Sequence, residues 1–222
     1  MINILLSQYN FHEEWIKDTI LKYISSNDKV VVIPFAFSER WISNNDEWQN
    51  AYSRSFGKYY GEIVDPFVQL GISEDNIIWL NYFEHSEEEM KSIIENSDIA
   101  FLTGGLPEMA VLRVLEKGLA NSIAGRRIVM GASAGALMQL ENYHVSPDED
   151  YTEFMYFPGL GLIKKDFYIE VHYEDTNIQN KCIKRVLKEK TDLVYGIKDN
   201  GAIIIEDGTI LLLGDVITFN SK

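Results

Sequence analysis

Cysteine is almost absent from this chain of 222 residues, because Cys182 is the only one. No disulfide can form within the chain, which is typical of proteins kept in a reducing compartment. Long apolar runs are also missing, and none approaches the roughly 20 residues that would span a bilayer. The first ten residues, MINILLSQYN, lack a basic segment and predict a strand rather than a signal peptide. We therefore expect a cytoplasmic protein.

Positive charge is scarce as well. The chain has 20 Lys and Arg residues against 34 Asp and Glu residues, which gives a net charge of −14. No basic cluster is present to bind a nucleic-acid backbone, and the acidic balance disfavours anionic membrane surfaces. We expect neither partner. Hydrophobic residues make up 46% of the chain, enough for one buried core, so a single domain is predicted over residues 1–222.

Short apolar runs alternate with amphipathic segments along the first two thirds of the chain. The runs are rich in Val and Ile, which is typical of strands covered on both faces in a parallel sheet. They occupy residues 2–6, 29–36, 76–83, 99–104 and 127–133. Helices are predicted between them at 12–24, in parts of 45–71 with a break near Gly57 or before Pro66, at 86–97 and at 107–118. The alternation predicts a doubly wound, mostly parallel α/β sheet with helices on both faces.

The last third of the chain has a different pattern. Residues 167–173 are predicted to be extended, and residues 177–190 to be helical. The stretch GAIIIEDGTILLLGDVITF then predicts two strands joined by a hairpin turn at 206–208. We expect these antiparallel strands to complete the sheet at its C-terminal edge.

The stretch MGASAGALMQL places Ser133 between Gly131 and Gly135, after a predicted strand and before an apolar helix. This G-x-S-x-G spacing is typical of a strained turn that exposes a nucleophilic serine hydroxyl. The alternative is close packing of a strand and a helix through small residues. Upstream, the glycines of TGG end another predicted strand. The N–H groups of Gly104 or Gly105, together with that of Ala134, are candidates for an oxyanion hole, or the TGG stretch is a plain turn.

A nucleophilic serine needs a base, and four histidines are available. His12 and His85 are predicted to be solvated, and His144 to lie on a surface loop. His172 lies late in a strand-like run, where strand ends gather, so it is the best candidate, with a structural role as the alternative.

The acid that orients the base is not fixed by spacing. The candidates are Asp148, Glu149, Asp150, Glu170, Asp175 and Asp199, with an exposed acidic loop as the alternative for the first three. Cys182 falls in a helical segment and indicates no thiol chemistry. No His, Cys, Asp or Glu spacing matches a metal site, and we expect neither a metal nor another cofactor.

The chain resembles the peptidase E family of serine peptidases, which includes aspartyl dipeptidases and, more distantly, cyanophycinases. The resemblance rests on NILLSQYNF, KVVVIPFAFSERW, IAFLTGG, GASAGAL, GLGLIKKDFYIEVHY and GIKDNGAIII. The last two are similar to the family patterns G-L-G-L…H-[YF] and G-[LI]-x-E-G-x-A. The resemblance implies a flavodoxin-like sheet related to class I glutamine amidotransferases, which use cysteine where this chain has Ser133.

The resemblance also implies roles for individual residues. Ser133 takes the place of the nucleophile and His172 that of the base, and the family's triad aspartate falls on Asp148, with Asp150 one slip away. Gly104 or Gly105, with Ala134, takes the place of the oxyanion hole. The family implies small peptide substrates, among them dipeptides that begin with aspartate, and often a homodimer.

Two departures from the family pattern bear on specificity. The family's GGN is GGLPE here, so Leu106 and Pro107 stand where a polar residue is usual beside the substrate. The segment after His172 lacks the arginine-bearing pattern of the Asp-X dipeptidases, although Lys181 or Lys184 is available to bind an acidic side chain. We therefore expect a serine peptidase with a Ser-His-Asp triad and an acyl-enzyme. The alternatives are a catalytically silent binding or regulatory protein on the same scaffold, and an esterase of the α/β-hydrolase type.

Overall fold

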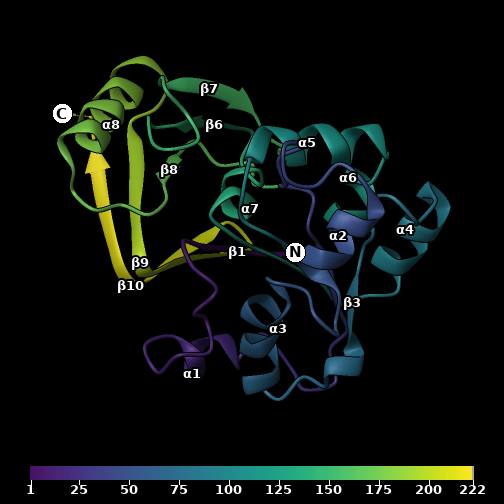
Figure 1. Cartoon of the computed structure of the whole chain (residues 1–222). Helices are drawn as coiled ribbons and strands as arrows, with labels where there is room; N and C mark the ends of the chain where they lie inside the picture. The colour runs from purple at the N-terminus through teal and green to yellow at the C-terminus, as the bar shows by residue number, and fades with distance from the viewer. Residues whose placement is uncertain (222) are drawn as a thin grey trace.

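An eight-stranded sheet forms the core of the molecule. The structure is a computed structural model, and it describes residues 1–221. The strand order of the sheet is β10-β9-β1-β5-β4-β2-β3, with β8 pairing beside β9 (Figure 1). Five adjacent strands of this order pair in parallel. They are β1 (Ile2–Leu6), β5 (Ile128–Ala132), β4 (Ile99–Leu102), β2 (Val30–Ile33) and β3 (Ile77–Trp79). The predicted parallel sheet is confirmed, and the carboxyl ends of these strands meet at one edge.

Two long antiparallel strands complete the sheet as predicted. β9 (Leu193–Glu206) pairs with β1 on one side and with β10 (Thr209–Asn220) on the other. The turn between them is two residues, Asp207 and Gly208, both with positive φ, which suits a tight hairpin. The first part of β9 pairs in parallel with β8 (Tyr168–Glu170) instead of β1.

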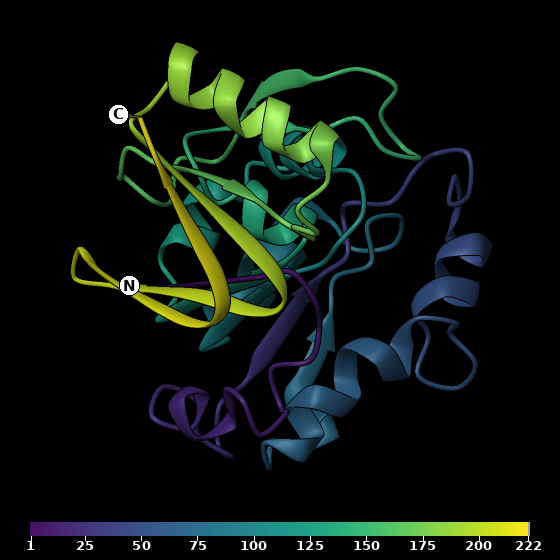
Figure 2. The ribbon, with the colours of Figure 1, turned by 90° about the vertical axis from the view of Figure 1, so that its left-hand side faces the viewer.

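Helices cover both faces of the sheet, as Figure 2 shows. Alternate strand residues point to opposite faces, so Leu5 packs with one group of helices while Ile4 and Leu6 pack with the other. The first group comprises α4 (Glu87–Glu95), α5 (Pro107–Glu116), α6 (Ala120–Ala124) and α7 (Ala134–Leu137). The second comprises α1 (Lys17–Ile20) and α3 (Tyr60–Gln69).

Two further units flank the sheet. α8 (Asn177–Glu189) begins with a capping box, in which the Thr176 and Gln179 side chains bond each other's backbone N–H groups, and its buried face packs on β8 and β9. β6 (Asn142–Val145) and β7 (Met155–Pro158) form a separate antiparallel pair. The remaining elements are α2 (Asn45–Tyr52) and the short 3₁₀ helix η1 (Glu74–Asn76). Among the described residues, no helix is both long and apolar enough to cross a membrane.

The helix predicted at residues 12–24 is wrong in extent, because only Lys17–Ile20 is α-helical. The N–H groups of Ile16 and Thr19 bond to carbonyls three residues back, and these bonds alternate with α-type bonds four residues back, so the segment is a mixture of turns. Ile16, Ile20 and Ile24 are nevertheless buried, as the apolar pattern requires.

The predicted helical region 45–71 divides into α2 and α3 at the turn that contains Gly57. A Cβ atom on Gly57 would lie 2.5 Å from the backbone nitrogen of Ser53, so the chain can pass there only with glycine. Pro66 lies inside α3 and does not end it.

Candidate active site

Ser133 lies on a sharp turn between β5 and α7, at the carboxyl edge of the sheet. Its backbone has φ 54° and ψ −117°, a conformation that non-glycine residues rarely adopt. The Ser133 N–H donates to the carbonyl of Leu6 at 2.9 Å, which ties the turn to the end of β1. The hydroxyl makes no hydrogen bond to another of residues 1–221. The turn therefore presents a free alcohol oxygen above the sheet edge.

The flanking glycines are required by packing. A Cβ atom on Gly131 would lie 2.1 Å from the carbonyl oxygen of Gly135, and one on Gly135 would lie 2.0 Å from that of Leu102. Both distances are far below any contact that a real Cβ atom makes. The G-x-S-x-G spacing thus lets α7 start directly against β4 and β5.

His172 follows β8 and also has a positive φ, of 50°. Its N–H donates to Ser7 Oγ at 3.0 Å, and its carbonyl accepts from Gln179 Nε2 at 2.8 Å. Ser7 Oγ in turn donates to the carbonyl of Ile197 on β9 at 2.7 Å. Ser7, directly after β1, and Gln179 of α8 therefore hold the backbone of His172, and Ser7 is itself bonded to β9.

The imidazole of His172 lies beside the carboxylate of Asp199. Nδ1 is 3.4 Å from Asp199 Oδ1 and 3.5 Å from Gln8 Nε2, and Gln8 Nε2 also donates to Asp199 Oδ1 at 3.3 Å. Asp199 is on β9, in the stretch between its pairing with β8 and its pairing with β1. With the ring proton on Nδ1 directed at Asp199, Nε2 is left as the proton acceptor.

Asp148, the acid that the resemblance favours, and Glu170 have other partners. Asp148 is exposed, and its Oδ1 accepts from the N–H groups of Asp150 and Tyr151, both at 2.8 Å. Glu170 is buried and bonds His144 Nε2 at 2.7 Å and Ser146 Oγ at 2.8 Å. No hydrogen bond joins Asp148, Asp150 or Glu170 to His172 within residues 1–221. The one carboxylate hydrogen-bonded to the His172 ring in the described chain is Asp199.

His144 was expected on a surface loop and is instead 2% exposed, inside β6. The short strands β6 and β7 have no marked alternation in the sequence, so the hairpin that buries His144 was not predictable. His12 and His85 do not line the cavity that contains Ser133.

The three predicted oxyanion donors differ in availability. The Gly104 N–H is already used, because it donates to the Tyr9 hydroxyl oxygen at 2.6 Å. The N–H groups of Gly105 and Ala134 have no acceptor within the described residues. A Cβ atom on Gly104 would lie 3.4 Å from that of Ser133, which brings the TGG turn against the serine. Gly105 and Ala134 are thus free to donate to a third group.

One cavity of about 540 Å³ joins these parts, and we call it the serine cavity. Ser133, Ala134, Gly105 and His172 line it, and so does Asp148 from the opposite loop. No hydrogen bond connects the Ser133 hydroxyl to His172 within residues 1–221. In free enzymes such a catalytic hydrogen bond is often long, and it shortens when the substrate binds. The cavity brings a serine hydroxyl, an imidazole and two free N–H groups to one space.

Asp199 as the partner of His172 was only one of six candidates from the sequence. The signal that points to it is GIKDNGAIII, in which Asp199 occupies the glutamate position of the pattern G-[LI]-x-E-G-x-A. Within residues 1–221, no group of three or more His, Cys, Asp or Glu side chains is placed so that it could hold a metal ion.

Comparisons with known proteins bear on the family and the fold of the chain. The model of peptidase family S51 matches residues 4–213. No curated protein matches the chain at a significant level. Among solved structures, a protein provisionally assigned as peptidase E from Listeria monocytogenes EGD-e is 20% identical, with a TM-score of 0.62 over 100% of this chain and 98% of that one. A peptidase from an acI-B1 Actinobacterium is 17% identical, with a TM-score of 0.68 over 99% and 90%. These structures share the fold.

Proposed function

Because this chain belongs to peptidase family S51 and is a serine-type peptidase, we propose that it cleaves small peptides with Ser133 as nucleophile and His172 as base. The observation that carries the proposal is the serine cavity, where a strained serine with a free hydroxyl and a histidine held by Ser7 and Gln179 line one space. We further propose Asp199, rather than Asp148, as the acid that orients His172, because it lies 3.4 Å from Nδ1.

The first half of the reaction forms an acyl-enzyme. His172 Nε2 takes the hydroxyl proton of Ser133 while Oγ bonds to the scissile carbonyl carbon. The carbonyl electron pair moves onto oxygen, where the N–H groups of Gly105 and Ala134 stabilise the charge. The C–N bond then breaks, and the leaving nitrogen takes the proton held by His172.

The second half restores the enzyme. His172 removes a proton from water, the hydroxide attacks the ester carbon, and the C–O bond to Ser133 breaks. Ser133 Oγ recovers its proton from His172, and the acyl group leaves as a carboxylic acid. Asp199 stabilises the imidazolium in both halves and keeps the Nδ1 proton directed away from the serine.

The decisive experiment pairs covalent labelling with turnover. A fluorophosphonate probe should label the wild-type chain on Ser133, identified by mass spectrometry, and leave Ser146 of the same cavity unlabelled. A dipeptide panel with varied first residues, aspartate included, should be hydrolysed by the wild type. Ser133→Ala should lose about 10⁶-fold in kcat while keeping its circular dichroism spectrum.

A folded protein that neither labels nor hydrolyses any peptide would support the silent-scaffold alternative instead. Turnover retained by a clean Ser133→Ala preparation would falsify the nucleophile assignment.

A further inference from the structure

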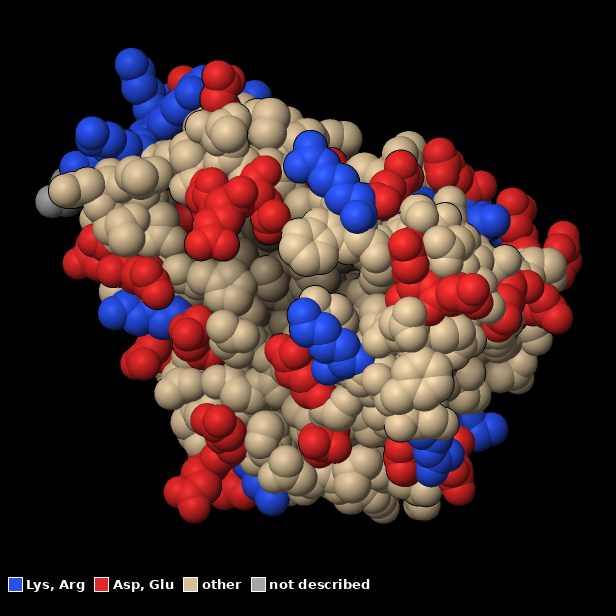
Figure 3. All heavy atoms as spheres, in the orientation of Figure 1, with Lys and Arg blue, Asp and Glu red and all other residues tan. Residues whose placement is uncertain are grey.

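A second cavity, of about 530 Å³, adjoins the serine cavity and has no role in the chemistry above. We call it the aromatic cavity, and it lies within the volume range of about 300–1,000 Å³ that is usual for small-ligand sites. Five aromatic residues line it: Tyr9, Phe37, Trp41, Tyr52 and Tyr59. It shares Gly105 and Asp150 with the serine cavity, so a ligand bound at Ser133 can extend into it. Figure 3 shows this face of the molecule hollowed near its centre.

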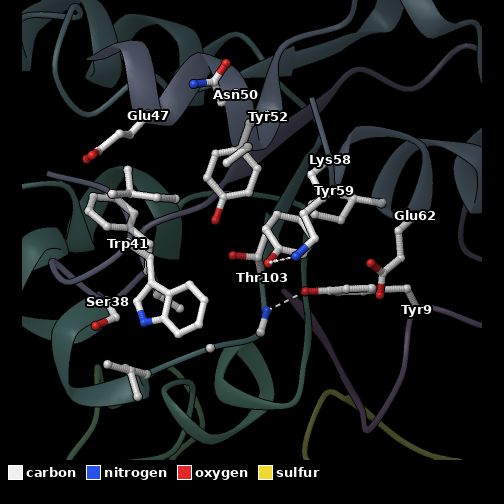
Figure 4. Close-up of a pocket in the computed structure, with 18 of the residues that line it drawn as sticks. Tyr9, Ser38, Trp41, Glu47, Asn50, Tyr52, Lys58, Tyr59, Glu62 and Thr103 are labelled. Carbon is white, nitrogen blue, oxygen red and sulfur yellow. Dashed lines mark hydrogen bonds between the residues drawn. The ribbon is translucent and has the colours of Figure 1, made fainter. Parts of the chain in front are cut away.

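The floor of the aromatic cavity is neutral and carries unpaired hydroxyls. Thr103 is 3% exposed, and its Oγ1 has no hydrogen-bond partner within the described residues. Tyr52 is 7% exposed, and burial raises its pKa, so its hydroxyl keeps its proton. Figure 4 shows both side chains directed into the space between Trp41 and Tyr59. A buried polar atom without a partner is uncommon, which makes Thr103 Oγ1 a candidate to meet a ligand.

The walls are fixed before any ligand binds. Arg113 donates through Nη1 to the carbonyls of Phe35 and Phe37, at 2.6 and 2.7 Å, and its guanidinium lies 3.7 Å from the centre of the Phe37 ring. On the other side, Tyr52 stacks on Trp79 with ring centres 5.4 Å apart. Trp41, by contrast, is 74% exposed and stands at the mouth.

The charges in this region disfavour an acidic occupant. Glu47, Glu62 and Asp150 line the cavity against the single cation Lys58. The Lys58 ammonium is itself 3.1 Å from the Tyr59 hydroxyl. Glu47 is held by the backbone and hydroxyl of Ser43, as part of the start of α2. Glu62, Lys58 and Asp150 are exposed, so the charges lie at the rim and the interior suits an uncharged group.

Leu106, the apolar residue of the GGLPE departure, also lines the aromatic cavity. Its N–H donates to the carbonyl of Ala36 at 2.7 Å, which joins the TGG turn to the opposite wall. The departure from a polar residue beside the substrate therefore faces an apolar, aromatic space. The proposed reaction does not by itself explain why Leu106 replaces a polar residue in GGLPE.

We propose that the aromatic cavity selects peptides that carry an aromatic residue next to the bond cleaved at Ser133. The inference rests on the proposed function. Aromatic rings packed edge-to-face or offset against Trp41, Tyr52 and Tyr59 are stabilised beyond the effect of their buried area. Thr103 and Tyr52 supply hydrogen bonds for a phenol hydroxyl.

Two peptide series test the preference, Xaa-Ala and Ala-Xaa, with Xaa as Ala, Asp, Lys, Phe or Tyr. In the series whose variable residue reaches the aromatic cavity, kcat/KM for Phe or Tyr should exceed that for Ala by about tenfold or more. Trp41→Ala should lower kcat/KM for that aromatic peptide about 5- to 10-fold more than it lowers kcat/KM for Ala-Ala. Phe56→Ala is the matched control, because Phe56 is 66% exposed and does not line the cavity, and it should change neither.

A preference for Asp or Lys, or an equal effect of Trp41→Ala on all peptides, would overturn the inference. Calorimetric titration of Ser133→Ala with the same peptides separates it from the proposed function. Binding of aromatic peptides that weakens in Ser133→Ala/Trp41→Ala would uphold the cavity even if the wild type hydrolyses nothing. Hydrolysis and probe labelling without aromatic preference would leave the peptidase intact and reject the cavity's role.

Discussion

Two residues of the site hold backbone conformations that side-chain-bearing residues seldom adopt. Ser133 has φ 54° and His172 has φ 50°. Such conformations cost about 1–3 kcal/mol each and persist only where the surroundings enforce them. At Ser133 the enforcement comes from the glycine contacts and the bond to Leu6, and at His172 from Ser7 and Gln179. Both residues proposed to react are therefore among the four non-glycine residues with positive φ in the described chain.

The acid is the residue-level assignment most open to test. Asp199→Asn keeps the shape of the side chain but removes the charge proposed to stabilise the His172 imidazolium, so kcat should fall about 10²–10⁴-fold. The range extends down to 10² because the Asp199 side chain is 62% exposed, and solvent weakens its interaction with the imidazolium. Steady-state kinetics on the best dipeptide measure the effect.

Asp148→Asn is the matched comparison, since Asp148 lines the same cavity but bonds its own loop. A loss in Asp148→Asn that equals or exceeds the loss in Asp199→Asn would return the role to the aspartate that family resemblance favours.

At the scale of elements, the active turn depends on how closely α7 approaches β4 and β5. The glycines at 131 and 135 leave no room for a methyl group, since backbone oxygens lie about 2 Å from the position of each Cβ. The serine is therefore placed by packing of the strand–turn–helix unit, and not by hydrogen bonds from its own side chain.

Gly135→Ala tests this packing. The new Cβ would lie 2.0 Å from the carbonyl oxygen of Leu102, which is backbone and cannot swing away. We expect a loss of about 1–3 kcal/mol or more in the free energy of unfolding, measured by urea denaturation, together with loss of probe labelling. Gly125→Ala is the control, because its Cβ would meet nothing closer than 3.5 Å. Equal stability of the two variants would contradict the packing account.

The sequence predicted most elements because their signals are local. The apolar runs, the N-cap Ser86 and the hairpin at 206–208 each depend on a few neighbouring residues. The failures have non-local causes. Residues 12–24 bury Ile16, Ile20 and Ile24 but form a mixture of turns instead of one α-helix. His144 is buried in a pair of strands joined across a loop.

The candidate site divides in the same way. Ser133 and His172 carry local motifs, and the structure places both on the serine cavity. The acid carries no local motif of comparable strength. Its position depends on how β9 changes partners 27 residues beyond His172, which is set by sheet topology. The Gly104 N–H is taken by Tyr9, a residue 95 positions away, which no spacing rule could indicate.

At the scale of the whole molecule, buried tyrosines link stability to alkaline pH. Burial, helped by a hydrogen bond to Asp175, raises the pKa of Tyr173 to about 12. The unfolded chain loses this proton near pH 10, so the folded state binds more protons between pH 10 and 12. The stabilisation is fully present below pH 10 and is lost as the pH rises toward 12.

Urea unfolding at pH 9, 10 and 11 measures this linkage. The free energy of unfolding should fall with pH above 10, and the contribution of one such group approaches about 1.4 kcal/mol per pH unit. The free energy of unfolding of Tyr173→Phe should fall less steeply with pH than that of the wild type. Identical slopes for the two proteins would show that Tyr173 does not contribute.

The pairing of β1 with β9 joins the two ends of the chain. Ile2 pairs with Glu206, so the opening strand meets its antiparallel neighbour only after almost the whole chain has been made. Under the proposed triad, Asp199 follows Ser133 on the ribosome, and full activity requires synthesis through β9.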